Sequence, residues 1–170
     1  GANGFIGRNL SDYLGRTHTV SELHKEDFKL NLEALKDKFE NTDAVINLAG
    51  QNIFTIWNRK NKRAIYESRV YTTKKIMQAI KLVKNKPYLH INASGVNIYD
   101  EKGKHTEQSG DFADNFLSYV VSDWEKAALE IREEEVKVAI ARFGTVIGET
   151  GGIIKQLRKY VASNLGFKLM

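Results

Sequence analysis

The chain opens with three glycines spaced three residues apart, in the segment GANGFIG (1–7). Apolar residues then recur at the spacing of one helix face, as far as Leu14. Because glycine has no Cβ, such a turn lets the backbone lie against a phosphate, and the free amides at the start of the next helix attract its charge. The pattern predicts a pyrophosphate-binding turn formed by Gly1, Asn3, Gly4, Phe5, Ile6 and Gly7.

A second group of reactive side chains centres on Ser94, which follows the apolar run 88–93. Tyr99 comes five residues later, in the polar loop 97–110. A serine hydroxyl can hydrogen-bond a reacting oxygen, and a tyrosine can give or take a proton. We predict Ser94 and Tyr99 as catalytic residues. The alternative for Tyr99 is a ring that only packs against its loop.

An alternative role for Ser94 is that of a hydrolase nucleophile with His105 and Asp111 as partners. The surrounding segment NASG lacks the first glycine and the spacing of a G-x-S-x-G turn, which disfavours this alternative. The histidines form no H-E-x-x-H pattern and the chain has no cysteine, so we expect no metal site.

Short apolar runs alternate with segments of helical periodicity. The runs 44–49 and 136–143 are apolar enough for strands buried on both faces. This alternation predicts an α/β fold with a parallel sheet, whose ligand lies beyond the carboxyl ends of the strands, where Gly50, Ser94 and Arg142 fall. The expected strands are 19–23, 44–49, 88–93 and 136–143, and the expected helices after the first are 32–39, 61–84, 114–133 and 151–163.

Composition fits a globular domain: 170 residues, of which 42% are hydrophobic and 28% charged, with a net charge of +5. The lysines are scattered among acids without interleaved aromatic residues, so we expect no nucleic-acid partner. The absence of cysteine favours a reducing compartment, and we expect a cytoplasmic protein. No apolar run approaches 18 residues, so we expect no membrane span.

These motifs resemble those of the short-chain dehydrogenase/reductase superfamily, in its extended, epimerase-like branch. The opening glycines match the glycine pattern of that branch, Ala93-Ser94 matches the catalytic serine position, and RFGTVIG (142–148) is similar to its R-x-x-x-V-x-G run. A narrower resemblance, to the atypical subgroup of uncharacterised bacterial and mitochondrial "epimerase family" proteins, covers nearly the whole chain. It rests on residues 44–53, Trp57, Lys62, Ile65, Ser68-Arg69, Thr73, 91–94, Tyr99, Thr106-Glu107, 123–125 and Gly151-Gly152.

The resemblance implies a Rossmann-like, doubly wound parallel sheet that binds NADP or NAD. It also implies that Leu48, Ala49 and Gly50 brace the adenine side of the cofactor. We expect a cofactor-binding domain over residues 1–150, without its first strand. Residues 151–170 would begin a C-terminal substrate-binding region whose larger part is missing.

In the usual chemistry of the superfamily, a tyrosine moves the hydroxyl proton and a lysine four residues later lowers its pKa. If Glu125 is the helix acid that follows this lysine by four, the two positions hold Leu117 and Val121, and neither can move a proton. The subgroup itself is known for lacking this pair. The resemblance therefore implies a non-standard active site.

Two other tyrosines were considered as proton donors. Tyr71 has Lys75 four residues later, but both precede the serine strand and fit an exposed helical pair better. Tyr119 has Asp123 four residues later, which would raise its pKa, the wrong direction for a base.

The cofactor choice stays open between NAD and NADP. Glu22 lies about 20 residues beyond the glycine turn, where an acid accepts from the ribose 2′-hydroxyl of NAD. Lys25 could instead pair with the 2′-phosphate of NADP, and we lean toward NADP. Arg69 and Arg142 are candidates for holding a phosphate, with a carboxylate partner as the alternative for Arg142.

We therefore expect an NAD(P)-dependent epimerase, that is, an isomerase or oxidoreductase, acting on a small carbonyl or nucleotide-sugar-like substrate. The alternative is a dinucleotide-binding sensor or assembly protein without turnover. By analogy with extended relatives, a homodimer could form through the helices 61–84 and 114–133.

Overall fold

The computed structural model describes residues 1–132, 135–149 and 151–154. Its sheet has three parallel strands in the order β1-β2-β3: β1 (Ala44–Asn47), β2 (Leu89–Gly95) and β3 (Lys137–Phe143). All three carboxyl ends therefore meet at one edge. The register places Ser94 of β2 directly beside Arg142 of β3.

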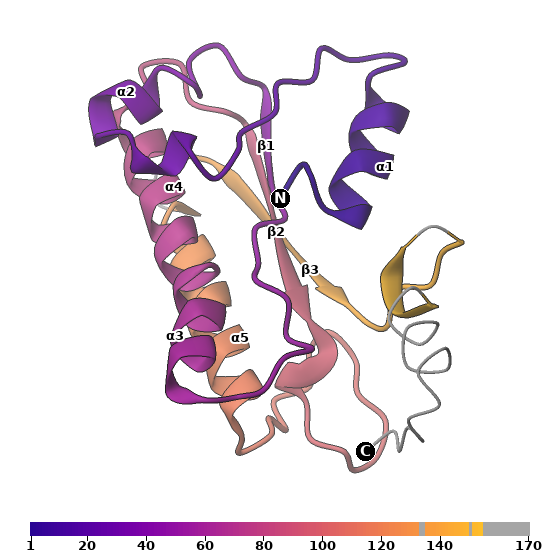
Figure 1. Ribbon diagram of the computed structural model, residues 1–170. Helices are drawn as coiled ribbons and strands as arrows, with labels where there is room; N and C mark the ends of the chain where they lie inside the picture. The colour runs from indigo at the N-terminus through magenta and orange to yellow at the C-terminus, as the bar shows by residue number, and fades with distance from the viewer. Residues whose placement is uncertain (133–134, 150, 155–170) are drawn as a thin grey trace.

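Helices lie on both sides of this sheet, as the doubly wound prediction requires. Figure 1 shows α1 on one side and the group formed by α2, α3, α4 and α5 on the other. In chain order these elements are α1 (Phe5–Leu14), η1 (Asp27–Lys29), α2 (Leu32–Lys36), α3 (Arg59–Glu67), α4 (Val70–Leu82), η2 (Val96–Ile98) and α5 (Phe116–Leu129).

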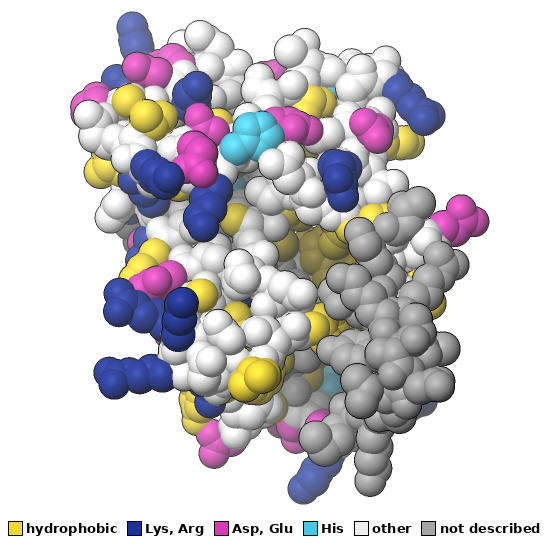
Figure 2. Space-filling view, viewed as in Figure 1, with side chains coloured by type: hydrophobic (Ala, Val, Ile, Leu, Met, Phe, Trp, Pro, Cys, Tyr) yellow, Lys and Arg dark blue, Asp and Glu magenta, His cyan; other side chains and the backbone are white. Residues whose placement is uncertain are grey.

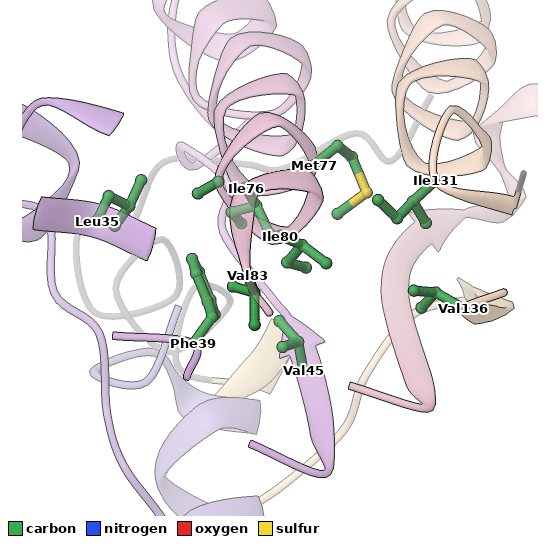
Figure 3. Packing of buried hydrophobic residues seen from close by; sticks show 10 residues of the cluster. Leu35, Phe39, Val45, Ile76, Met77, Ile80, Val83, Ile131 and Val136 are labelled. Atoms are coloured by element: carbon green, nitrogen blue, oxygen red, sulfur yellow. The ribbon is translucent and has the colours of Figure 1, made fainter. Parts of the chain in front are cut away.

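The main core lies between the sheet and the helices of this second group. Figure 3 shows how its apolar side chains converge from α2, α4, β1 and the segment after α5. A smaller cluster packs nearer the carboxyl edge and contains Val70, Ala93, Trp124 and Ala127. The two clusters fix α4 and α5 against the sheet, and so position the residues that these helices carry toward that edge.

Residues 19–23, predicted as a strand, form no strand in the structure. A strand needs a neighbour to complete its hydrogen bonds, and the described sheet pairs only β1, β2 and β3. Val20 is 39% exposed, whereas Leu23 is partly buried and packs against the main core, so this short run contacts the core without joining the sheet.

The single helix predicted over 61–84 is two helices, which meet at Ser68 and Arg69. The Ser68 hydroxyl donates to the carbonyl oxygen of Ile65 at 3.0 Å, and the Arg69 guanidinium donates to the same oxygen at 3.2 Å. These side chains satisfy backbone groups that a continuous helix would use, and α3 ends there.

The other helices and strands agree with the prediction to within a few residues at their ends. The helix predicted over 151–163 lies mostly outside the described residues, as does most of the region 151–170 assigned to a substrate lobe.

Candidate active site

The opening glycines form a tight turn packed against the end of β1. The amide of Gly4 donates to the carbonyl oxygen of Gly1 at 3.0 Å. A Cβ placed on Gly1 would lie 2.2 Å from the carbonyl oxygen of Leu48, and one placed on Gly7 would lie 2.3 Å from the carbonyl oxygen of Gly1. Both approaches are too close for any side chain, so the turn requires glycine at these two positions.

Helix α1 begins at this turn without a cap. Its N-cap residue Gly4 offers no side-chain acceptor, and no acidic residue lies in the first turn. In contrast, α2, α3 and α5 are capped by asparagine side chains at 31, 58 and 115. Among the described residues, no acceptor is found for the amides of Phe5, Ile6 and Gly7. The start of α1 is therefore suited to bind an anion.

The Phe5 ring packs against Gly148 and Gly151 in the segment after β3. A Cβ on Gly148 would lie 2.2 Å from its Cζ atom, and one on Gly151 would lie 2.1 Å from its Cδ2 atom. Phe5 thus contributes its backbone to the predicted site, while its side chain fastens α1 to the segment after β3.

The segment after β1 is shaped by buried polar side chains beneath it. The Asn47 side chain accepts from the amide of Ala49 at 3.0 Å and donates to Thr73 at 2.8 Å and Asn92 at 2.7 Å. These bonds turn the chain at Leu48 toward the glycine turn. Of the predicted residues Leu48, Ala49 and Gly50, Leu48 lies against Gly1 of that turn, whereas Gly50 lies against the Arg69 side chain.

The two residues predicted to discriminate between NAD and NADP lie on the exposed segment after α1. The carboxylate of Glu22 lies 3.9 Å from the imidazole of His24. The Glu22 side chain also lies near Gly1. Lys25 is exposed, as is Asn3 of the glycine turn.

Ser94 belongs to a buried hydrogen-bonded group at the carboxyl ends of β2 and β3. Its hydroxyl donates to Oε1 of Glu125, which is 8% exposed. Arg142 donates to the same carboxylate through Nε at 2.8 Å and through Nη2 at 2.7 Å. Its hydrogen bonding to the Glu125 carboxylate is the main reason why the pKa of Arg142 is raised. Arg142 is therefore paired with a carboxylate, as one of the two sequence alternatives had it.

Tyr99 joins this group through its hydroxyl. The hydroxyl accepts from Nη1 of Arg142 and donates to the carbonyl oxygen of Thr106 at 2.8 Å. The ring stacks on His105 with centroids 4.8 Å apart. Ser94 and Tyr99 are thus connected through Glu125, which accepts from Ser94, and Arg142, which donates to both Glu125 and Tyr99. Tyr99 packs against its loop through His105 and also belongs to the polar group; its predicted catalytic role stays a prediction.

The structure shows no serine hydrolase arrangement at Ser94, because its hydroxyl is directed at Glu125 and His105 lies against Tyr99. Leu117 and Val121, which the sequence analysis aligned with the missing tyrosine and lysine, both lie on α5. Val121 is 6% exposed and packs near Gly95. The described residues also contain no group of acidic and histidine side chains suited to hold a metal ion.

The other considered residues have structural partners. Lys75 donates to the carbonyl oxygens of Phe28 at 2.8 Å and Leu30 at 2.7 Å, so it anchors the segment before α2 instead of pairing with Tyr71. A hydrogen bond to Asp114 is the main cause of a raised pKa at Tyr119; the partner is therefore Asp114 and not Asp123.

The two tryptophans differ in their surroundings. Trp124 is 5% exposed and donates to Thr73 at 2.9 Å, which makes it a core residue. Trp57 is 42% exposed on the loop after Gly50. Only Trp57 is therefore free to line a cleft.

Sequence reasoning missed the part that Glu125 plays. It was used only to align the missing tyrosine and lysine, although a carboxylate on a predicted buried helix face needs a partner. The nearest signal was Arg142 at a strand end, for which a carboxylate partner had been considered.

Charged side chains of both signs lie on the surface. Figure 2 shows Lys and Arg side chains spread over the viewed face with Asp and Glu among them. No helix in the described part of the chain is long and apolar enough to cross a membrane.

Comparison with known proteins places this site in context. Residues 1–165 match a family described as the NAD dependent epimerase/dehydratase family. The chain is 31% identical to the epimerase family protein YfhF of Bacillus subtilis, over 94% of this chain and 58% of that protein. It is also 31% identical to the chloroplastic SDR39U1 homolog of Arabidopsis thaliana, over 92% of this chain and 50% of that one.

Solved structures show the same fold. The human epimerase family protein SDR39U1, crystallised with NADPH, has a TM-score of 0.81 at 28% identity, covering 97% of this chain and 59% of that chain. A nucleoside-diphosphate sugar epimerase from Corynebacterium glutamicum has a TM-score of 0.74 at 26% identity, covering 96% of this chain and 37% of that one. The chain thus spans less than two thirds of the length of these relatives.

Proposed function

Because the chain belongs to the NAD dependent epimerase/dehydratase family, we propose that it binds NADP or NAD at the glycine turn and acts as an epimerase or reductase. The substrate would be a carbonyl compound or a nucleotide sugar. The observation that carries the proposal is the uncapped start of α1. The turn before it packs against Leu48 at Gly1, and the amides at 5–7 have no acceptor of their own among the described residues.

The residues present fit such a cofactor. The turn amides would hold its pyrophosphate, and the segment Leu48–Gly50 would lie along its adenine side. Glu22 would accept from a ribose hydroxyl, whereas Lys25 would pair with a 2′-phosphate. The bound dinucleotide would supply the hydride acceptor or donor. The relative crystallised with NADPH supports testing NADPH first.

The hydrogen bonds of Ser94 define its part in the proposed chemistry. Its single hydroxyl proton is directed at Glu125, whose carboxylate also accepts two hydrogen bonds from Arg142. The lone pairs of Ser94 Oγ are therefore left for a ligand. In this arrangement Ser94 accepts a hydrogen bond from a substrate hydroxyl and so orients it.

Tyr99 would act from the other side of Arg142. Its hydroxyl proton is held by the carbonyl oxygen of Thr106, on the loop that follows β2. A substrate oxygen that takes the place of this carbonyl would receive the proton from Tyr99. Movement of the Thr106 loop would then be coupled to proton transfer.

The test is turnover of the purified protein with NADPH and NADH over a panel of carbonyl compounds and nucleotide sugars. Ser94→Ala and Tyr99→Phe should each lower turnover at least tenfold while dinucleotide affinity stays unchanged. Ser122→Ala and Tyr88→Phe serve as matched controls and should keep full activity. Unchanged turnover in the Ser94 and Tyr99 variants would remove both residues from the proposed site.

A second function, a dinucleotide-binding sensor or assembly protein without turnover, is favoured by Leu117 and Val121. Neither can exchange a proton, and Val121 lies close to Gly95, since a Cβ placed there would lie 3.9 Å from its Cγ2 atom. Micromolar binding of NADPH combined with no turnover across the panel would support this second function. Absence of any dinucleotide binding would contradict both.

A further inference from the structure

Arg69, at the junction of α3 and α4, places a guanidinium beside the turn that follows β1. Its Cζ atom lies 5.3 Å from the centre of the Trp124 ring. A Cβ placed on Gly50 would lie 3.1 Å from both Cζ and Nη2 of Arg69, so the guanidinium lies directly against the backbone at Gly50. Glycine at position 50 allows this approach.

Only one nitrogen of this guanidinium has hydrogen-bond partners in the described part of the chain. Nη1 donates to the carbonyl oxygens of Gln51 at 3.0 Å and Ile65 at 3.2 Å. Nε and Nη2 belong to a guanidinium whose flat face lies against Gly50, and they have no acceptor among the same residues. Neither atom is among the fully buried polar atoms without a partner, so solvent reaches the Nε–Nη2 edge.

The charge of Arg69 is also not compensated. No carboxylate of the described residues lies within ion-pair distance of it, whereas Arg142 and Arg63 each have a glutamate partner. Burial lowers the pKa of Arg69, which reflects the cost of keeping this cation partly out of water. A half-buried, unpaired guanidinium is stabilised when an anion binds to it.

The position of this free edge connects it to the proposed site. Gly50 lies two residues beyond Leu48, whose carbonyl group contacts the glycine turn at Gly1. The Nε–Nη2 edge is thus at the same carboxyl edge of the sheet as the proposed dinucleotide site. Two parallel N–H groups match the two oxygens of a carboxylate or phosphate.

We propose that the Nε–Nη2 edge of Arg69, beside Gly50, is an oxyanion subsite that binds a phosphate or carboxylate group of a bound ligand. The proposal rests on the proposed function, because it places the anion on a ligand held next to the glycine turn. The group belongs either to the dinucleotide or to the substrate. Both sources present the same chemistry to Arg69.

The experiment compares the wild-type protein with Arg69→Gln, Arg69→Lys and the control Arg59→Gln, which removes an exposed arginine of α3. NADPH affinity is measured by fluorescence titration. The effect of inorganic phosphate on the melting temperature is measured with and without saturating NADPH. Saturating NADPH fills the glycine turn, so any remaining phosphate effect reports another site.

Two results support the subsite and separate its sources. If Arg69 binds a phosphate of the dinucleotide, Arg69→Gln weakens NADPH binding at least tenfold, and phosphate competes with NADPH in the wild type. If Arg69 binds a substrate group, NADPH affinity is unchanged, and phosphate raises the melting temperature of the NADPH-bound wild type but not of NADPH-bound Arg69→Gln. In both cases Arg69→Lys is intermediate, because it keeps the charge and loses the paired donors.

Equal responses of the wild type, Arg69→Gln and Arg59→Gln to both probes would overturn the subsite. If Arg69→Gln does not fold, the test uses the wild-type protein alone. The subsite is then overturned if phosphate neither competes with NADPH nor changes the melting temperature of the NADPH-bound protein. A wild-type protein that binds neither NADPH nor NADH contradicts the proposed function instead. Phosphate added without NADPH still tests Arg69 in that case.

Discussion

Arg142 donates two hydrogen bonds to the carboxylate of Glu125, from Nε at 2.8 Å and from Nη2 at 2.7 Å. The pair joins β3 to α5, and its side chains are only 20% and 11% exposed. Because the carboxylate also accepts from Ser94, the pair determines the direction of the Ser94 hydroxyl. One ion pair thus serves both the packing of α5 and the proposed chemistry.

Removal of the Glu125 carboxylate should strongly destabilise the protein. Glu125→Ala leaves the Arg142 charge partly buried without its counter-ion, and breaking a buried pair in this way costs about 3 kcal/mol. Urea unfolding followed by circular dichroism measures the change. The matched control is Glu67→Ala, which breaks an exposed pair with Arg63 and should cost less than about 1 kcal/mol. Similar losses in the two variants would contradict this account.

Acid should weaken the fold through His90 of β2. Burial lowers the pKa of His90 to about 4, from the ordinary value of 6.5 for an exposed histidine. Above pH 6.5 the residue is neutral in both states and contributes no pH dependence. Between 6.5 and 4 the unfolded chain gains a proton that the folded chain does not, so stability falls as pH falls, by about 3 kcal/mol in total.

The free energy of unfolding, measured from pH 7.5 to 4, checks the His90 prediction. His90→Gln should remove most of the slope in this range, even if its stability at pH 7 is lower. His18→Gln, which changes an exposed histidine, should leave the slope as it is. A slope unaffected by His90→Gln would assign the acid sensitivity to other groups.

The glycine turn should not accept a side chain at position 7. A Cβ there would lie 2.3 Å from the carbonyl oxygen of Gly1 and 2.6 Å from that of Ala2. Gly7→Ala should therefore displace the turn and reduce NADPH affinity at least tenfold, measured by fluorescence titration. Gly110→Ala is the control, since nothing lies within 4 Å of a Cβ at that position. Wild-type affinity in Gly7→Ala would show that the turn does not hold the dinucleotide.

Thr73 of α4 accepts two buried hydrogen bonds, from the Asn47 side chain and from Trp124. Thr73→Val keeps the side-chain shape but leaves the indole N–H of Trp124 without an acceptor. An unpaired buried donor costs about 1–3 kcal/mol, which thermal and urea unfolding can detect. Thr72→Val, one residue earlier and less buried, should have a much smaller effect. A loss below about 0.5 kcal/mol for Thr73→Val would contradict the assigned network.

The order of strands and helices followed from the sequence because these signals are local. Runs such as 44–49 and 136–143 are mainly apolar, and the glycine spacing at 1–7 marks the start of α1. The expected burial of the second run on both faces was wrong, since Lys137 and Ala139 of β3 are exposed. The break between α3 and α4 was not predictable in this way. It depends on Ser68 and Arg69 bonding to Gln51 and Ile65, and Gln51 belongs to a different segment of the chain.

The candidate site was predictable in its members but not in its connections. Ser94, Tyr99 and Arg142 were identified from strand ends and motif spacing, yet Glu125 links the first to the third only because α5 packs over β2 and β3. For segment 19–23 the predicted element itself was wrong. Its short apolar pattern resembles a strand, but no described neighbour pairs with it, and residue order alone does not reveal pairing.

The ring of Phe5, held between Gly148 and Gly151, joins the beginning of the chain to the segment after β3. During synthesis the first helix emerges from the ribosome long before those two glycines do. Its aromatic side chain therefore has no place to dock until almost the whole described chain is exposed. Helix α1 thus reaches its final position late in folding. Chains interrupted before β3 would expose the Phe5 ring to solvent and to chaperones.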